Sequence, residues 1–349
     1  MKKTLSILLA GAMVCSLSAC SGKSTETKAS ATETAVTTGA AATEAVATTK
    51  QAAGGDPVFK IGVLQLVQHA ALDASNEGFF AALDDAGVTY EADQQNAAGE
   101  QSACQTIAEK LVNDKDDLIL AIATPAAQAA ASVTEEIPIL LTAVTDPAES
   151  GLVASNDAPA GNVSGASDLT PVTEQIDLLV QLIPAAKTVG ILYCSAESNS
   201  VLQAEMAKQA CAAKGLTCKE FTVSNSNEIQ TVVESMIGKV DAIYAPTDNM
   251  IAAGMATVSM IATDNKLPII CGEAGMVKAG GLATYGIDYY QLGYLAGQQA
   301  VQILVEGKDV GTIPIAYLPL DKCQLTVNKA IADTLGVDIT ALTNATIVE

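Results

Sequence analysis

Two small polar motifs, each directly after a short apolar run, are the residues of this chain whose types first suggest chemistry. The apolar runs are residues 118–123 and 137–144, and they are followed by TPA (124–126) and TDP (145–147). These motifs offer hydroxyl groups and a carboxylate. A helix that begins beside each motif would add backbone N–H groups that have no partner inside the helix. The combination predicts a site that binds a small polar ligand.

An alanine-rich helical segment separates the two runs, so the stretch has the pattern of a βαβ unit with buried parallel strands. In open parallel sheets, ligands bind in the crevice beyond the carboxyl ends of the strands. Both polar motifs follow the ends of predicted strands. We therefore expect them to share one edge of a sheet.

The same alternation of apolar runs and amphipathic segments continues through the rest of the chain. It predicts a first lobe, then a second lobe that begins with a helix near residue 171, and a final part that returns between the lobes. The predicted strands are 60–67, 89–95, 163–169, 188–194, 282–288, 313–319 and 323–327, and the predicted helices are 72–86, 100–114, 171–183, 289–306 and 329–335.

An internal repeat indicates that the two lobes have the same topology. Gly62 and Gly87 are separated by the same number of residues as Gly190 and Gly215, in the similar contexts IGVLQ…AGVT and VGILY…KGLT. The DLILA and DAIYA stretches and the EIPI and KLPI stretches repeat in the same order. The predicted fold is α/β, with two doubly wound parallel-sheet lobes joined by a multi-crossing hinge. Two such lobes close around a ligand by hinge motion. The predicted boundaries are 58–170 plus 285–312 for lobe one, and 171–284 plus 313–349 for lobe two.

The N-terminal residues have the features of an export signal. Lys2 and Lys3 precede an apolar segment, 4–14, which is too short to span a bilayer as a lasting helix. Leu17-Ser18-Ala19-Cys20 resembles the lipobox of bacterial lipoproteins, which implies cleavage after residue 19 and lipidation of Cys20. A plain signal peptide with a coincidental cysteine is the alternative. Residues 20–57 are rich in Thr, Ala and Glu and are predicted to be a disordered tether.

Charge and composition exclude some partners and restrict the site. The chain has 18 Lys+Arg against 39 Asp+Glu, and all of the basic residues are lysine. An acidic chain with few aromatic residues is unsuited to nucleic acid. Without arginine, a ligand carboxylate must be bound by N–H groups, hydroxyls or a lysine.

The cysteines and the single histidine, His69, give no indication of a metal or another cofactor. Apart from Cys15 and Cys20, most of the cysteines lie in apolar helix or strand patterns, which favours buried thiols. Disulfides remain the alternative in an exported protein, with Cys211 and Cys218 as the first pair to consider. The other internal cysteines are Cys104, Cys194, Cys271 and Cys323.

Several segments together resemble a family of ABC-transporter substrate-binding lipoproteins, some of whose members bind tryptophan or tyrosine. The segments are IGVLQLVQHAALDASNEGF, AIATPAAQ, TAVTDP, GILYCSAESNS, YAPTDN and YGIDYYQLG, within residues 59–337. The resemblance implies a type I periplasmic-binding-protein fold and capture of a small solute, expected to be an amino acid, for a membrane permease. It also implies a monomer that is lipid-anchored on the extracytoplasmic face of the cell membrane.

Matching these segments to the family places candidate ligand contacts at strand ends of both lobes. Each has an alternative role, because His69 could order a turn and Thr124, Asp146, Glu197 and Asp248 could cap helices. The candidates are Gln65, Gln68, His69, Asn96, Thr124, Ala126, Thr145, Asp146, Glu197, Asn199, Asp248, Glu273 and Asp288.

The carboxylate and ammonium groups of a zwitterionic ligand would bind to different candidate residues. The carboxylate is expected on helices that begin after Thr124 and Thr145. The ammonium is expected at Asp288, with Asp248 or Glu273 as the alternative acid. Two other functions are alternatives: a ligand-sensing lipoprotein that signals to a receptor, and an extracellular enzyme. The sequence has no G-x-S-x-G motif or metal cluster, and no second histidine, which disfavours the enzyme.

Overall fold

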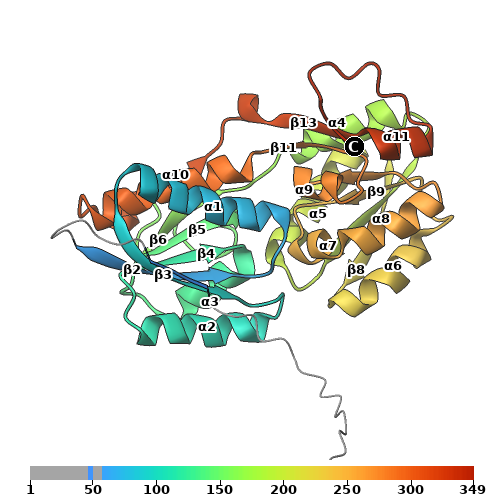
Figure 1. Ribbon diagram of the computed structural model, residues 1–349. Coiled ribbons are helices and arrows are strands. Elements are labelled where there is room, and N and C mark those ends of the chain that lie inside the picture. Colours follow the sequence, from blue (N-terminus) through green and yellow to red (C-terminus); the bar gives the residue numbers. More distant parts are fainter. Residues whose placement is uncertain (1–45, 50–56) are drawn as a thin grey trace, which may run out of the picture. The chain divides into compact units, whose positions relative to one another are not determined.

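The computed structural model describes residues 46–49 and 57–349, which form two seven-stranded sheets with helices on both faces (Figure 1). The predicted signal peptide and Cys20 lie outside the described residues. Among the helices of the described part, none is long and apolar enough to cross a membrane.

The first sheet contains the strands on either side of the TPA motif. Its order is β1-β3-β2-β4-β5-β6-β12, and β1 alone runs antiparallel to its neighbour. The strands are β1 (Val46–Thr49), β2 (Val58–Gln65), β3 (Thr89–Asn96), β4 (Leu118–Ile122), β5 (Ile139–Val144), β6 (Val163–Ser167) and β12 (Ala316–Tyr317).

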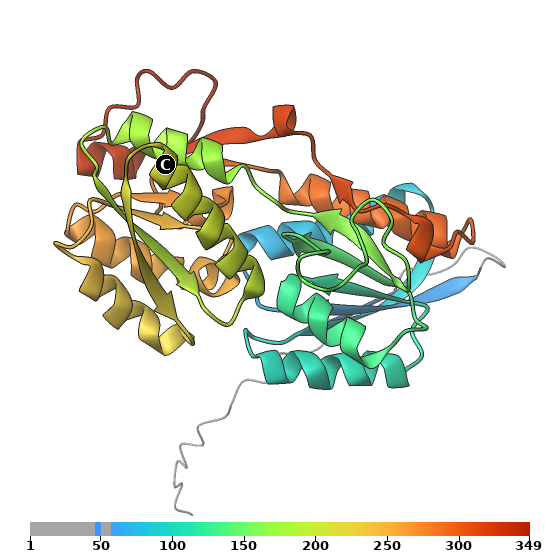
Figure 2. The ribbon, with the colours of Figure 1, turned by 180° about the vertical axis from the view of Figure 1, so that it is seen from behind.

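Two pairs of helices cover this sheet. One pair is α1 (Ala70–Asp85) with α10 (Tyr289–Leu304), and the other is α2 (Gln101–Asn113) with α3 (Thr124–Val133). The pairs lie on opposite faces in both views (Figures 1 and 2). Strands β4 and β5 are buried along their whole length, as expected for parallel strands covered on both faces.

The second sheet has the order β14-β13-β11-β10-β9-β7-β8, with β11 and β13 antiparallel and the other pairs parallel. The strands are β7 (Thr188–Cys194), β8 (Thr217–Val223), β9 (Ala242–Ala245), β10 (Ile269–Cys271), β11 (Ala283–Gly286), β13 (Gln324–Asn328) and β14 (Thr346–Val348). Its α-helices are α4 (Val172–Leu182), α5 (Ser198–Ala213), α6 (Ile229–Met236), α7 (Asn249–Ala253), α8 (Met255–Asp264), α9 (Ala274–Lys278) and α11 (Lys329–Leu335).

Separate apolar cores stabilise the two lobes. One cluster fills lobe one, and two clusters lie around the sheet of lobe two, with Tyr244 in one and Met255 in the other. Three short 3-10 helices complete the described elements: η1 (Ser226–Glu228), η2 (Val310–Thr312) and η3 (Leu320–Lys322).

The chain passes between the sheets after β6, again between β11 and β12, and again between β12 and β13. Three sequence boundaries differ from the observed elements. Residues 285 and 286, assigned to lobe one, are in β11 of the second sheet. Residues 46–49, inside the predicted disordered tether, form β1, which pairs with β3. Ala316–Tyr317 was assigned to lobe two, but β12 pairs with β6 of the first sheet. A two-residue strand carries too little periodicity for the sequence to assign it to a sheet.

The predicted repeat is present in the structure. The orders β3-β2-β4-β5 and β8-β7-β9-β10 are equivalent. Gly87 and Gly215 have φ values of 71° and 72°, which suit the residue that ends a helix. Asp117 and Asp241, just before β4 and β9, accept backbone N–H groups from the neighbouring strands β2 and β7, Lys60 N at 2.7 Å and Thr188 N at 2.8 Å.

Candidate functional site

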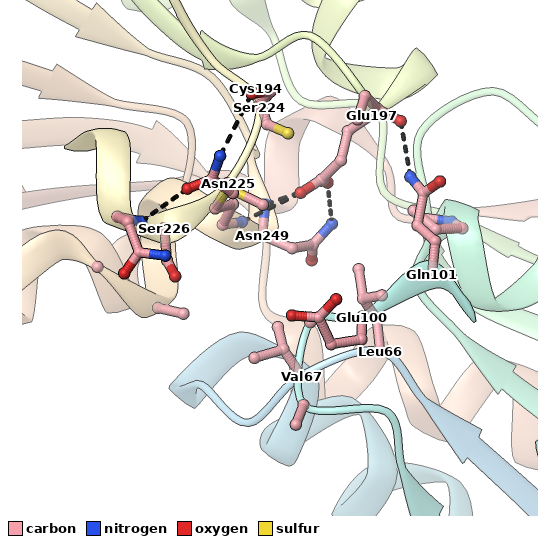
Figure 3. A pocket seen from close by; sticks show the side chains of 18 of the residues that line it. Leu66, Val67, Glu100, Gln101, Cys194, Glu197, Ser224, Asn225, Ser226 and Asn249 are labelled. Carbon is pink, nitrogen blue, oxygen red and sulfur yellow. Dashed lines mark hydrogen bonds between the residues drawn. The ribbon is translucent and has the colours of Figure 1, made fainter. Parts of the chain in front are cut away.

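A cavity of about 530 Å³ lies between the loops that follow the strands of the two lobes. Lobe one contributes Leu66, Val67 and Pro125 after β2 and β4, and lobe two contributes Met250 and the polar segment 224–227. Figure 3 shows side chains of both lobes facing this space. Its volume is in the range of small-ligand sites. The cavity is therefore at the carboxyl edges of the sheets, as predicted.

Glu197 lines this cavity and is 4% exposed. Its carboxylate accepts from Asn249 Nδ2 at 2.6 Å, from Met250 N at 3.1 Å and from Asn249 N at 3.3 Å (Figure 3). Burial, and then the nearby Asp248 carboxylate, raise the pKa of Glu197 to about 8. Glu197 thus binds the N-terminus of α7 and also lines the cavity, while its side chain makes no capping hydrogen bond to α5, the helix that it opens.

A hydrogen bond from His69 to Asn249 joins the lobes beside Glu197. Asn249 Nδ2 donates to Glu197, so its Oδ1 faces His69 Nε2, at 3.2 Å. His69 Nε2 must then carry the proton. Burial lowers the pKa of His69, which favours the neutral ring. His69 Nδ1 is consequently a buried acceptor, and it has no hydrogen-bond partner.

Asp248 and Glu273 use their carboxylates within lobe two. Asp248 accepts from Ile251 N at 2.8 Å and from Cys194 N at 2.6 Å, and Glu273 accepts from Met276 N at 2.7 Å and from Gly275 N. These bonds cap α7 and α9. Burial raises the pKa of Asp248, and it raises that of Glu273 to about 7.

Asp168, which was not among the predicted residues, follows β6 and is 4% exposed. Its Oδ2 accepts from the Tyr289 hydroxyl at 2.7 Å, while its Oδ1 has no hydrogen-bond partner. Burial raises the pKa of Asp168 to about 6, against the lowering effect of hydrogen bonding from Tyr289 and from the Thr145 hydroxyl. Asp168, His69, Asp248 and Glu273 line a hollow of about 10 Å³.

Three further hydrogen bonds cross between the lobes. Gln203 of α5 is 0% exposed, and its Nε2 donates to Thr145 Oγ1 at 3.1 Å. Gln101 Nε2 donates to Ala196 O at 2.9 Å, and Gln128 Nε2 lies 3.4 Å from Ser198 Oγ. Thr145 is therefore at the lobe interface, but a turn rather than the expected helix follows it.

Thr124 begins α3 and is 1% exposed, and its Oγ1 has no hydrogen-bond partner. No capping side chain bonds to this helix end, and the preceding residue, Ala123, has φ of 86°. Such a backbone is costly for a residue with a Cβ and often marks a functional site. Ala126 is buried in the first turn, and Pro125 lines the large cavity.

Other predicted residues have local structural roles in this conformation. Gln65 donates to Asp73 Oδ1 at 2.7 Å, and Asn96 Oδ1 accepts from Ala98 N at 2.8 Å. Asp146 accepts from Ala148 N at 3.1 Å within a turn, so it stabilises this turn and caps no helix. Asp288 is exposed and caps α10 through Gln291 N at 3.2 Å. It lines a different pocket, of about 210 Å³.

Two of the remaining candidates differ in exposure. Gln68 is exposed. Asn199 is buried, with its Nδ2 3.2 Å from Thr247 O and its Oδ1 without a partner.

Sequence analysis missed several residues that line the cavities. Asp168 lies inside the predicted strand 163–169, so selecting polar residues that follow strands passed over it; the observed strand β6 ends one residue earlier, at Ser167. Leu66 and Val67 gave no signal, because apolar residues at a strand end resemble the core. The missed residues include Leu66, Val67, Glu100, Asp168, Asn225, Asn249, Met250 and Tyr289.

The internal cysteines are free thiols, as favoured from the sequence, and all except the half-buried Cys218 are buried. Among the described residues, no group of His, Cys, Asp and Glu side chains is arranged to hold a metal ion.

Residues 60–346 match the family described as ABC transporter substrate binding protein. The chain belongs to this family. It is 44% identical over 279 residues to the tyrosine-binding protein of Clostridioides difficile strain R20291, an alignment that covers 79% of each chain. The predicted family, the type I periplasmic-binding-protein fold and the substrate-binding function are thereby confirmed.

Two solved structures of relatives indicate the conformation seen here. One is a Streptococcus pneumoniae ABC domain in complex with L-Trp, with 39% identity and a TM-score of 0.81, covering 84% of this chain and 100% of that chain. The other is the ligand-free, open structure of a Clostridium difficile substrate-binding protein, with 42% identity and a TM-score of 0.64, covering 84% and 99%. The identities are similar, so the higher score with the complex indicates that the lobes lie as in the ligand-bound relative.

Proposed function

We propose that the protein binds an aromatic L-amino acid between its lobes and delivers it to an ABC importer. The observation that carries this proposal is a set of buried polar atoms from both lobes that have no partner and lie at the strand ends. These atoms are Thr124 Oγ1, Asp168 Oδ1, His69 Nδ1 and Asn199 Oδ1. Buried polar groups normally have partners, and a bound solute would supply them. Relatives named for tyrosine or crystallised with L-Trp support an aromatic solute.

The ligand carboxylate would bind at the N-terminus of α3. The first turn of a helix has unpaired N–H groups and a positive dipole end, both of which favour an anion. No side chain caps α3, whereas Asp248 and Glu273 already cap α7 and α9. Thr124 would add its hydroxyl. The chain has no arginine and the large cavity has no lysine in its lining, so no cation competes for this role.

The ligand side chain would occupy the 530 Å³ cavity. Leu66, Val67 and Met250 provide apolar surface for a ring, and Asn225 and Glu100 provide polar groups beyond it. A ring with a polar substituent, such as that of tyrosine, matches this mixture of groups.

The remaining parts of the function concern location and partners. We propose that Cys20 is lipidated, that the protein acts as a monomer on the extracytoplasmic face, and that its membrane partner is an ABC permease. The Cys20→Ser variant should leave the membrane fraction without a change in ligand affinity. The matched control is Cys15→Ser, in the same leader, which should stay membrane-bound. Release of both variants or of neither would contradict the lipobox assignment.

We also propose that the protein performs no chemistry on its ligand. The experiment is calorimetry of ligand-stripped protein against the twenty standard L-amino acids, followed by mass spectrometry of the recovered ligand. Tyrosine or tryptophan should bind and be recovered intact. Binding of none of the amino acids would refute the proposed solute, and recovery of a converted product would indicate an enzyme.

A further inference from the structure

A small hollow beside the large cavity indicates how the solute is oriented. Its volume of about 10 Å³ is close to the space that one water molecule requires. His69 and Leu72 of lobe one and Asp168, which follows β6, face Asp248 and Glu273 of lobe two. Asn249 lines both the hollow and the large cavity. A ligand in the large cavity could therefore place a group of one heavy atom in the hollow.

Among the acids that line the hollow, Asp168 is the one with an oxygen that has no hydrogen-bond partner. Both oxygens of Asp248 and both of Glu273 accept backbone N–H groups. Asp168 Oδ1 is buried without a hydrogen-bond partner, and Tyr289 holds the other oxygen at 2.7 Å. The orientation of the Asp168 carboxylate is thus fixed, and one acceptor is open.

His69 provides a second open acceptor on the same hollow. Its Nε2–H donates to Asn249 Oδ1, which leaves the Nδ1 lone pair without a donor. Asp168 Oδ1 and His69 Nδ1 both accept hydrogen bonds and have no donor. They therefore need a ligand group that carries several N–H or O–H bonds. The residues that line the hollow include no lysine. A buried carboxylate without a cation is costly.

We propose that the α-ammonium group of the bound amino acid occupies this hollow and donates to Asp168 Oδ1 and His69 Nδ1. This inference rests on the proposed function and names Asp168 as the acid that selects an amino acid over its deaminated analogue. An ammonium group has the size of the hollow, carries the missing positive charge and has three donors. Tyr289 acts as a positioning residue, since it reaches the ligand only through Asp168.

The test compares L-tyrosine, 3-(4-hydroxyphenyl)propionate, which lacks the amine, and tyramine, which lacks the carboxylate, by calorimetry. The parent protein should prefer L-tyrosine to the propionate by on the order of 100-fold, equivalent to about 2.7 kcal/mol. Asp168→Asn should lose most of that preference, because its affinity for L-tyrosine falls while that for the propionate changes by less than about threefold. Tyramine binding should fall in parallel with that of L-tyrosine.

Two further variants provide a control and a second test of Asp168. Asp116→Asn is the matched control, because Asp116 also has a buried oxygen without a partner but lies before β4, away from these cavities. It should retain the full preference for L-tyrosine. Tyr289→Phe removes only the hydroxyl and should weaken the preference by roughly tenfold. It reports on Asp168 even if Asp168→Asn fails to fold.

The outcomes separate this inference from the proposed function. If the parent binds L-tyrosine but Asp168→Asn or Tyr289→Phe keeps the full preference, the ammonium site is elsewhere and the inference fails alone. An equal loss of affinity for L-tyrosine and the propionate would mean that Asp168 is only structural, which also overturns it. If the parent binds none of the three ligands, the proposed tyrosine solute and this inference both fail.

Discussion

His69 Nε2 lies 3.2 Å from Asn249 Oδ1, and this contact joins the two lobes beside the cavity. Asn249 is in turn held by Glu197, so a chain of three side chains crosses from one lobe to the other. Together with the bond from Gln203 to Thr145, it fixes how the loops after β2 and β5 meet lobe two. These contacts can form only when the lobes are close together. They therefore depend on the same closure that a ligand would stabilise.

Gln203 should influence the balance between open and closed lobes. Gln203→Leu removes its bond to Thr145, so the ligand-free variant should open and have a larger radius of gyration than the ligand-free parent. A saturating aromatic amino acid should compact it again, with affinity reduced by roughly 1–3 kcal/mol. Small-angle scattering with and without ligand measures the first effect, and calorimetry measures the second.

Gln175→Leu is the control for this prediction. Gln175 is equally buried, but its amide donates to Gly272 O and Tyr285 O, both in lobe two. Its loss should lower the melting temperature without opening the lobes. If ligand addition changes the radius of gyration neither of Gln203→Leu nor of the parent, the closure mechanism is excluded.

The sequence predicted the architecture well because the information for it is local and repeated. Buried parallel strands such as 118–122 are continuous apolar runs, and the glycine pairs mark the same positions in both lobes. The edge elements were predicted less well, because β12 and β14 have only two and three residues. β14 was not predicted, and β12 lies within the predicted strand 313–319 but pairs with the other sheet. Their position depends on contacts far along the chain, which periodicity does not record.

The site was predicted at the level of its edge but not of its individual contacts. Glu197, Asp248 and Glu273, which were candidates because they follow strands, line the cavities. Whether a carboxylate caps a helix or remains open depends on side-chain direction, which the sequence does not show. The sequence therefore favoured Asp288, with Asp248 or Glu273 as the alternative, and did not single out Asp168. Asp288 at a hinge strand end is in fact exposed, and its carboxylate accepts Gln291 N.

The thiols should be titratable in the denatured protein without reductant. The structure contains six free cysteines, from Cys104 to Cys323. A chain that begins at Ser21 should therefore give six equivalents in a thiol assay. Cys211 and Cys218 interact closely, since their mutual hydrogen bond raises the pKa of Cys211 and lowers that of Cys218. Four equivalents, restored to six by reductant, would instead mean that two cysteines form a disulfide. Five equivalents in Cys218→Ser, with or without reductant, would then identify the pair as Cys211 and Cys218.

The ligand-free protein should become less stable as the pH rises from about 5 to 8. Burial raises the pKa of Glu197 to about 8 and that of Glu273 to about 7, from an ordinary value of 4.5. Between these values the folded protein retains protons that the unfolded chain has lost, so the free energy of unfolding falls with rising pH. Melting temperatures measured across this range give the slope.

Glu197→Gln tests the origin of that slope. The variant cannot ionise at this position, so its melting temperature should depend less on pH than that of the parent. Because the pKa of Glu197 is about 8, the difference should be clearest between pH 6 and 8. Glu205→Gln is a suitable control, because Glu205 is exposed on the same helix, α5. An equal slope in Glu197→Gln and the parent would show that Glu197 is ionised throughout this range.

Thr124 should matter for the carboxylate end of the ligand and not for its amine. Thr124→Val keeps the shape of the side chain and removes the hydroxyl that has no protein partner. Because the N–H groups of α3 remain, affinity for L-tyrosine should fall by only roughly 1–3 kcal/mol. Tyramine, which lacks the carboxylate, should bind the variant and the parent equally. Calorimetry with both ligands separates these effects.

The matched control is Thr142→Val. Thr142 lies in β5, is 0% exposed and also has a hydroxyl without a partner. The same loss of a hydroxyl there should leave L-tyrosine affinity unchanged, because Thr142 lies within the sheet and not at the N-terminus of α3. Equal affinity losses in the two variants would mean that Thr124 acts through the fold. Unchanged affinity in Thr124→Val would mean that the ligand carboxylate does not bind at the start of α3. N–H groups elsewhere at the cavity edge would then have to bind it.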